Sequence, residues 1–189
     1  MLEGIILIAV LVLLAVWAIA VYNRLVRLRF LVKEAFSGIT VQLRRRFDLV
    51  PNLVSTVEGY AAHEKSVLTE VTAHRADATS ASGVAATAAA DNAFTGMLGR
   101  LMAVAEAYPD LKADDNFRQL QDELTEVEDQ LQSARRYYNA TVRDLNSRVQ
   151  SFPDVLFARL LGFSEEEFYA DADTAIQQAP KVQFGAAKA

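Results

Sequence analysis

The chain has 189 residues, of which 52% are apolar and 23% are charged, and its formal net charge is −5. The absence of cysteine excludes disulfides, thiolate catalysis and cysteine metal sites. The acidic balance gives no support to nucleic-acid binding as a property of the whole protein. Eight glycines and four prolines are few for this length, which favours long helices over a fold rich in turns.

The first segment is an unbroken apolar run from Ile5 to Val21. As a helix rising 1.5 Å per residue, the uncharged stretch from Gly4 to Asn23 spans about 30 Å, which is the thickness of a bilayer core. Trp17 lies near one end of the run, where aromatic rings favour the membrane interface. Residues 1–23 are therefore expected to form a transmembrane anchor.

Two alternatives to an anchor are a cleaved signal peptide, because Ala18-Ile19-Ala20 resembles a cleavage site, and a buried helix of a soluble protein. The run has no basic region before it and exceeds the usual length of a signal-peptide core, which favours the anchor. Positive charges follow the run instead of preceding it. The positive-inside rule thus predicts a single-pass protein of the cell (inner) membrane, with its N-terminus outside and its C-terminal domain in the cytoplasm. The basic residues concerned are Arg24, Arg27, Arg29 and Lys33.

Beyond the anchor, apolar residues recur at steps of three and four, which predicts helices. The first helix continues the anchor without a break, and Asp48 and Pro51 are expected to mark a turn and the start of a second helix. The low-complexity stretch 75–93 is interpreted as a connection that is partly helical, because alanine favours helix. A third helix containing Phe94 is expected to stop before Pro109.

The fourth helix has the clearest pattern, and it is expected to begin at a cap on Asp114 or Asp115 and to break at Pro153. Its stripe is expected to pack inside the domain, although a strict heptad could also serve self-association as a coiled coil. Four amphipathic helices can hide their stripes only against one another. The predicted fold is all-α, with a transmembrane helix continuous with an antiparallel four-helix bundle of long helices. The bundle is assigned to residues 24–165 and a C-terminal tail to residues 166–189.

Three adjacent arginines, Arg44, Arg45 and Arg46, form a candidate interaction site. Because successive residues point around a helix, the three side chains cannot all face one partner. They could be a solvated helix end, where cations favour the macrodipole. The alternatives are a contact for acidic groups of a neighbouring subunit and a contact for lipid or nucleic-acid phosphate.

A second candidate surface is the segment from Phe152 to Phe163, which is dense in large apolar side chains. In an up-and-down bundle the fourth helix returns toward the membrane, so this segment is expected to lie against the bilayer or a neighbouring anchor. The alternative is that these side chains close the open end of the bundle. The membrane-proximal candidates are Phe152, Leu156, Phe157, Leu160 and Phe163.

The sequence contains only two histidines, His63 and His74, which is too few for the paired Glu-x-x-His motif of a di-iron bundle. A histidine phosphotransfer domain is a rival four-helix bundle, and His63 close to Lys65 matches it weakly. The sequence shows no phosphate-binding glycine loop and no plausible serine triad. We expect no enzyme activity, no metal or cofactor, and neither a small-molecule substrate nor a nucleic-acid partner.

Two stretches of the chain resemble the LemA family of bacterial membrane proteins. Residues 22–75 contain the VQLRRRFDLVPNLV segment, and residues 106–153 contain YPDLKA, RRYYNATVRDLN and SFP, with GFSEEEFY following. The resemblance implies an N-terminal anchor followed by a cytoplasmic helical bundle, and it brings no catalytic residues because the family has no established activity. A magnetosome-associated protein belongs to the same family, which suggests a role in membrane organisation. Little similarity is expected after Ala170.

The leading functional hypothesis is a structural or scaffolding protein in the lipid bilayer. It would form homo-oligomers or organise membrane protein partners. The alternative is a cytoplasm-facing adaptor that recruits a partner protein without self-assembly. Neither hypothesis assigns catalytic residues to the chain.

Overall fold

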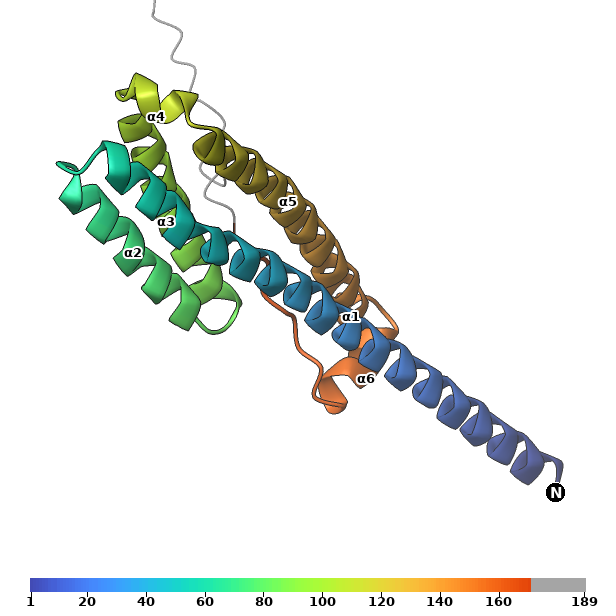
Figure 1. The fold of residues 1–189 in the computed structure, drawn as a ribbon. Helices are drawn as coiled ribbons and strands as arrows, with labels where there is room; N and C mark the ends of the chain where they lie inside the picture. The colour runs from blue at the N-terminus through green and yellow to red at the C-terminus, as the bar shows by residue number, and fades with distance from the viewer. Residues whose placement is uncertain (171–189) are drawn as a thin grey trace, which may run out of the picture.

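The longest element of the protein is a single helix, α1, that runs from Leu2 to Tyr60. The computed structural model describes residues 1–170. The N-terminal part of α1 projects well beyond the other helices, whereas its remaining length lies among them (Figure 1). The anchor segment and the first helix of the domain are therefore one continuous element, as the sequence predicts.

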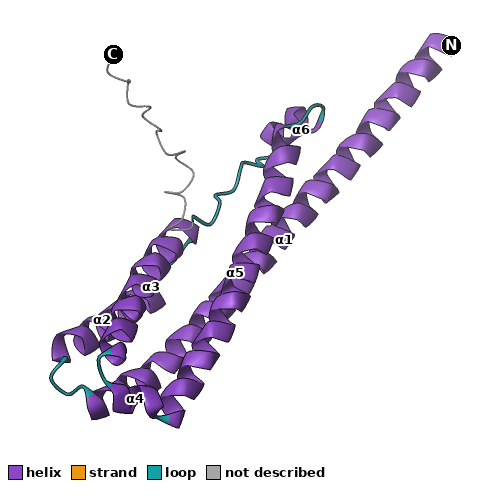
Figure 2. Ribbon diagram, turned by 90° about the horizontal axis from the view of Figure 1, so that it is seen from above, coloured by secondary structure: helices purple, strands orange, loops and turns teal. Residues whose placement is uncertain are grey.

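Five further helices complete the described part of the chain, which contains no strand. α5 lies antiparallel to α1, and we call this pair of helices the stem of the molecule. α2 and α3 form a hairpin beside the distal half of α1 (Figures 1 and 2). The predicted all-α class is confirmed. The finer expectation of an antiparallel four-helix bundle of long helices is not confirmed. The helices are α2 (Lys65–Ser80), α3 (Val84–Glu106), α4 (Pro109–Ala113), α5 (Asp115–Gln150) and α6 (Asp154–Leu160).

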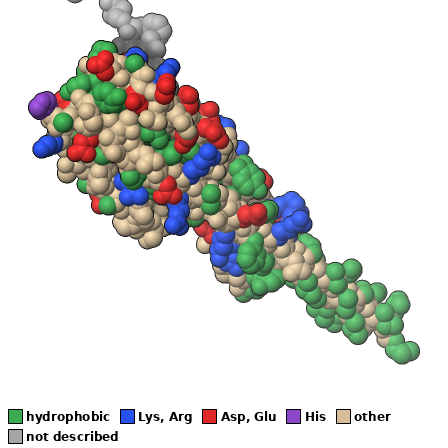
Figure 3. Space-filling view, in the orientation of Figure 1, with side chains coloured by type: hydrophobic (Ala, Val, Ile, Leu, Met, Phe, Trp, Pro, Cys, Tyr) green, Lys and Arg blue, Asp and Glu red, His purple; other side chains and the backbone are tan. Residues whose placement is uncertain are grey.

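The projecting end of α1 has the surface of a membrane helix. Hydrophobic side chains cover it, and lysine and arginine side chains gather where it meets the rest of the molecule (Figure 3). Among the described helices, α1 alone is long and apolar enough to cross a membrane. This pattern is the one that the sequence predicts for an anchor followed by basic residues.

The predicted turn at Asp48 and Pro51 is wrong, because α1 continues through both residues and the chain turns at 61–64 instead. A proline inside a helix lacks the N–H that would bond the carbonyl four residues earlier. Here that carbonyl belongs to Phe47, and Nε of Arg75 in α2 donates to its oxygen at 2.7 Å. A side chain from the neighbouring helix thus replaces the missing donor and allows α1 to continue past its proline.

Replacing Arg75 with methionine is expected to lower the free energy of unfolding by about 1–3 kcal/mol, because the Phe47 carbonyl loses its donor. The loss should shrink in a Pro51→Ala background, where the new alanine supplies an N–H to the same carbonyl. A double-mutant cycle measured by urea unfolding and circular dichroism gives this coupling. Equal losses in the two backgrounds would show that Arg75 stabilises the protein in some other way.

The alanine-rich stretch 75–93 is more helical than the predicted connection. α2 and α3 together take up almost all of it, and only 81–83 form the turn between them. Alanine has the highest helix propensity, and Gly83 turns the chain with a φ of 83° that glycine adopts without strain. The small side chains of Ala78 and Ala88 are buried, so the stretch also contributes to the core.

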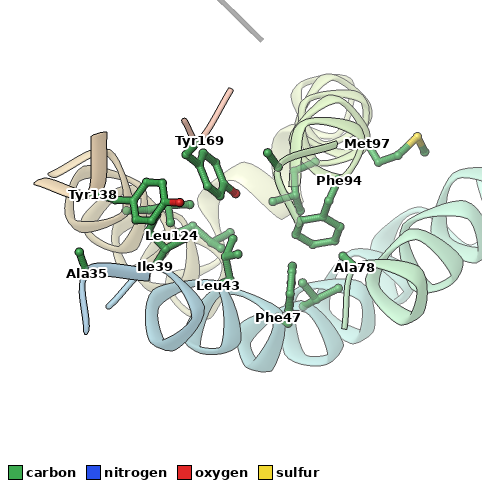
Figure 4. Packing of buried hydrophobic residues seen from close by; sticks show 14 of the residues in the cluster. Ala35, Ile39, Leu43, Phe47, Ala78, Phe94, Met97, Leu124, Tyr138 and Tyr169 are labelled. Atoms are coloured by element: carbon green, nitrogen blue, oxygen red, sulfur yellow. The ribbon is translucent and has the colours of Figure 1, made fainter. Parts of the chain in front are cut away.

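The fourth predicted helix is confirmed as α5. Asp114 is its N-cap, and its Oδ1 accepts a hydrogen bond from the backbone N–H of Phe117 at 2.9 Å. The helix ends before Pro153, as expected. Its apolar stripe packs on α1, and together with apolar residues of α2 and α3 it forms one core, which contains an edge-to-face pair of Phe47 and Phe94 (Figure 4).

Candidate functional site

The three adjacent arginines point in different directions and do not form one surface. Arg44 is exposed and borders a hollow between α1 and the turn of the α2–α3 hairpin. Arg45 is half exposed and lies 3.5 Å from Glu126 on α5. Arg46 is buried and contacts both α3 and α5. The three side chains therefore have different surroundings, as expected from the rotation of successive residues around a helix.

Arg46 belongs to a buried group of charges centred on Asp91 of α3. The Asp91 carboxylate lies 3.1 Å from Nη1 of Arg46 and is also hydrogen-bonded by Arg135 of α5. The hydroxyl of Tyr169 donates to the same carboxylate at 2.8 Å. One oxygen of Glu128 lies 3.2 Å from Arg46, and the other lies 3.7 Å from Arg135. We call these five residues, Arg46, Asp91, Glu128, Arg135 and Tyr169, the Asp91 cluster.

The Asp91 cluster is electrically balanced, with two arginines and two carboxylates, and buried charges are tolerated when they are paired. Burial opposes the charge of Arg135, but Asp91, together with Tyr169 and Glu128, outweighs that effect, so the pKa of Arg135 lies above its ordinary value. Burial and the Asp91 charge both raise the pKa of Tyr169, so its hydroxyl stays protonated and donates at neutral pH. The cluster ties α1, α3 and α5 to the C-terminal segment at one point.

Residues 163–170 form a strap along α5 that is held by two asparagines seven residues apart. Nδ2 of Asn146 donates to the carbonyl of Glu166 at 2.9 Å, and Oδ1 of Asn146 accepts from the N–H of Glu166 at 2.9 Å. Asn139 makes the same pair of bonds with Tyr169, at 3.2 and 2.8 Å. Residues seven apart share a helix face, so the two pairs align the strap with α5 (Figure 2).

Tyr138 of α5 holds the strap between these two asparagines. Its hydroxyl donates to the carbonyl of Glu167 at 2.8 Å, and burial raises the pKa of Tyr138 to about 12. The rings of Tyr138 and Tyr169 lie 6.5 Å apart in an edge-to-face arrangement (Figure 4). The strap thus brings Tyr169 to the Asp91 cluster and keeps it there.

The chemistry of the Asp91 cluster suits a lock between helices. The Asp91 carboxylate is engaged by two arginines and a tyrosine, so it is not presented as a free base or nucleophile. Residues 1–170 contain no group of three or more His, Asp or Glu side chains that could hold a metal ion. His63 lies in the loop after α1 and His74 lies within α2, so the two histidines do not share a helix face.

The five membrane-proximal candidates lie on and beside α6, next to the N-terminal half of α1. Phe157 packs edge-to-face on Trp17 with 4.8 Å between the ring centroids, and Phe163 packs on Tyr22 at 5.9 Å. The structure divides the candidates into an inner pair that packs on α1 and an outer trio that is exposed. The outer trio is Phe152, Leu156 and Leu160.

Sequence reasoning missed Asp91, Arg135, Glu128 and Tyr169. A signal for the first two is present, because Asp91 lies three residues before Phe94 and Arg135 lies three residues before Tyr138, so each charge occupies an apolar helix stripe. A charge on a buried stripe must find a partner. Tyr169 carries no such signal, because its position depends on how the strap folds back on α5.

Comparison with known proteins gives a family match and several relatives. A model of the LemA family matches residues 35–184. Magnetosome protein MamQ 2 of Paramagnetospirillum magneticum is 27% identical over 176 residues, covering 79% of this chain and 65% of that protein. Magnetosome protein MamQ of Magnetospirillum gryphiswaldense is 26% identical over 174 residues, covering 78% of this chain and 64% of that protein. Protein LemA of Metamycoplasma hominis is 27% identical over 135 residues, covering 69% of this chain and 60% of that protein.

The extent of these matches is informative. The chain spans less than two thirds of the length of these relatives. The family match includes every residue of the Asp91 cluster and the strap, and it reaches residue 184, so the expectation of little similarity after Ala170 is wrong. The predicted tail begins at residue 166, within the strap, and its part from 171 to 189 lies outside the described residues.

Proposed function

The chain belongs to the LemA family, and on that premise we propose that it is a structural membrane protein that assembles with itself or with other membrane proteins. α1 would cross the bilayer once, with its N-terminus outside and the remaining helices in the cytoplasm. Two relatives are named magnetosome proteins, which favours a role in organising a membrane over a role in metabolism.

The observation that carries this proposal is the continuity of α1. One helix contains both the apolar run Ile5–Val21 and the core residues Ile39 and Leu53, with no linker between them. From Asn23 to Tyr60 this helix rises about 55 Å at 1.5 Å per residue. A rod that is continuous with its anchor holds the distal helices at a fixed distance from the membrane, which suits a scaffold.

A mass measurement in detergent separates self-assembly from the adaptor hypothesis. The chain has a mass of 20.8 kDa. We expect light scattering after size-exclusion chromatography to give a protein mass of twice that value or a higher whole multiple. A discrete multiple that persists on dilution supports self-assembly. A monomer at every concentration would contradict it and would favour an adaptor that recruits a cytoplasmic protein.

The proposed orientation is tested with single cysteines, which the natural chain lacks. A membrane-impermeant thiol reagent is expected to label the Glu3→Cys variant in intact cells and to miss the Asp122→Cys variant, at an exposed position of α5. Labelling of Asp122→Cys after permeabilisation is the control for reactivity. The reverse pattern would place the helical domain outside the cell.

A further inference from the structure

The position of α6 along α1 is set by an aromatic contact. Phe157 of α6 packs edge-to-face on Trp17, with 4.8 Å between the ring centroids. Trp17 lies within the apolar run Ile5–Val21, about 6 Å short of its C-terminal end at 1.5 Å per residue. Whatever layer surrounds this end of the run must therefore also meet α6.

α6 has an inner face that is packed and an outer face that is bare. Asp154 and Ala158 are buried against the stem, so the inner face closes the end of the α1–α5 pair. By contrast, Phe152 and Leu160 each keep 81% of their surface accessible, and Leu156 keeps 61%. Leu156 and Leu160, four residues apart, share one side of the helix, and Phe152 lies just before its first turn. We call Phe152, Leu156 and Leu160 the outer face of α6.

Basic side chains follow the apolar ones at this end of the stem. Arg24 and Arg27 are exposed on α1 just beyond the apolar run, and Arg159 is exposed on α6. The guanidinium of Arg29 lies over the ring of Phe163, 4.5 Å from its centroid. Arginines at this height can reach lipid phosphates while their apolar neighbours lie among acyl chains. The order of apolar and then basic residues thus complements a bilayer surface with anionic headgroups.

We propose that the outer face of α6 inserts into the interfacial layer of the same bilayer that α1 crosses. This inference rests on the proposed anchoring by α1. The tilt and rotation of a spanning helix are set by its packing and its interfacial anchors. α6 supplies such an anchor on one side of α1, so it fixes the orientation of the stem and the height at which the α2–α3 hairpin is presented.

Spin labelling of the full chain in nanodiscs of neutral and anionic lipid tests this inference, since the natural sequence has no cysteine. Single-cysteine variants carry a nitroxide at three exposed positions: Leu160→Cys on the outer face, Leu11→Cys in the apolar run and Phe168→Cys in the strap. Collisions are measured with oxygen, which concentrates in lipid, and with a nickel chelate, which stays in water. We expect the oxygen-to-nickel ratio at Leu11→Cys and Leu160→Cys to be several-fold higher than at Phe168→Cys.

The outcomes distinguish this inference from the proposed function. A Leu160→Cys label as open to nickel as the Phe168→Cys label, beside a lipid-exposed Leu11→Cys label, would overturn the seating of α6 and leave the anchor intact. A Leu11→Cys label open to nickel would overturn the anchoring by α1, and the seating of α6 with it. Unchanged circular dichroism of each variant confirms that the label reports on the native fold.

Discussion

Replacing Asp91 with alanine is expected to lower the free energy of unfolding by about 3–5 kcal/mol, because two buried arginines lose the carboxylate that they share. A domain is typically stable by only about 5–15 kcal/mol, so this variant should lie close to its unfolding limit. Urea and thermal unfolding of the full chain in detergent, followed by circular dichroism, measure the loss. Asp122→Ala, at an exposed position of α5, is the matched control and should change stability by less than about 0.5 kcal/mol.

Removing the buried charges together should recover much of this stability. Asp91→Leu combined with Arg46→Met and Arg135→Leu replaces ions by apolar side chains, an exchange that is often neutral or stabilising in buried sites. Glu128 is only partly buried, so water can solvate it when its arginine partners are removed. The triple variant should therefore be more stable than Asp91→Ala. If the triple variant is as unstable as Asp91→Ala, the loss of stability comes from altered packing and not from unpaired charge.

The helices could be predicted where their determinants are local. α5 shows an apolar stripe with a cap at Asp114 and a break before Pro153, and all of these lie in one segment of sequence. Pro51 is the opposite case, because local rules read it as a helix start. The donor that satisfies the Phe47 carbonyl comes from Arg75 on another helix, and no sequence pattern near Pro51 predicts this contact. Local rules fail where a tertiary contact replaces a missing local one.

The Asp91 cluster was only partly predictable for a related reason. The arginine triplet is visible as a charge run, but a rotation of about 100° per residue sends Arg44 to solvent, Arg45 toward α5 and Arg46 into the core. Arg46 follows the stripe residue Leu43 by three positions, so the period that predicted the core also implied its burial. Its partner Asp91 lies in the alanine-rich stretch. The composition of that stretch predicted a connection between helices, so a buried charge was not expected there.

The strap is expected to detach from α5 when both of its asparagines are replaced. In the variant Asn139→Ala with Asn146→Ala, the backbone N–H and carbonyl groups of Glu166 and Tyr169 lose their partners. A buried polar group left without a hydrogen bond costs about 1–3 kcal/mol, and four groups are affected, so exposure of the strap to water becomes favourable. α5 itself should persist, because alanine favours helix more than asparagine does.

Hydrogen exchange of the full chain distinguishes detachment of the strap from unfolding. In the double variant the Glu166 and Tyr169 amides should exchange at least about a hundredfold faster, which corresponds to about 2.7 kcal/mol. Amides in the middle of α5 should keep their protection, and Asn116→Ala, at an exposed position of the same helix, should leave the strap unchanged. Retained protection at Tyr169 would show that its contact with the Asp91 cluster is enough to hold the strap.

Detachment of the strap should also change the cost of losing Asp91. Once Tyr169 has left, the Asp91 carboxylate gives up its hydroxyl partner, and water gains access to Arg135 beside it. A charge pair that water can reach contributes less than one that is fully buried. Asp91→Ala should therefore lower the free energy of unfolding by measurably less in the Asn139→Ala/Asn146→Ala background than in the natural chain. Additive losses would mean that the strap and the Asp91 cluster stabilise the protein independently, even though Tyr169 connects them.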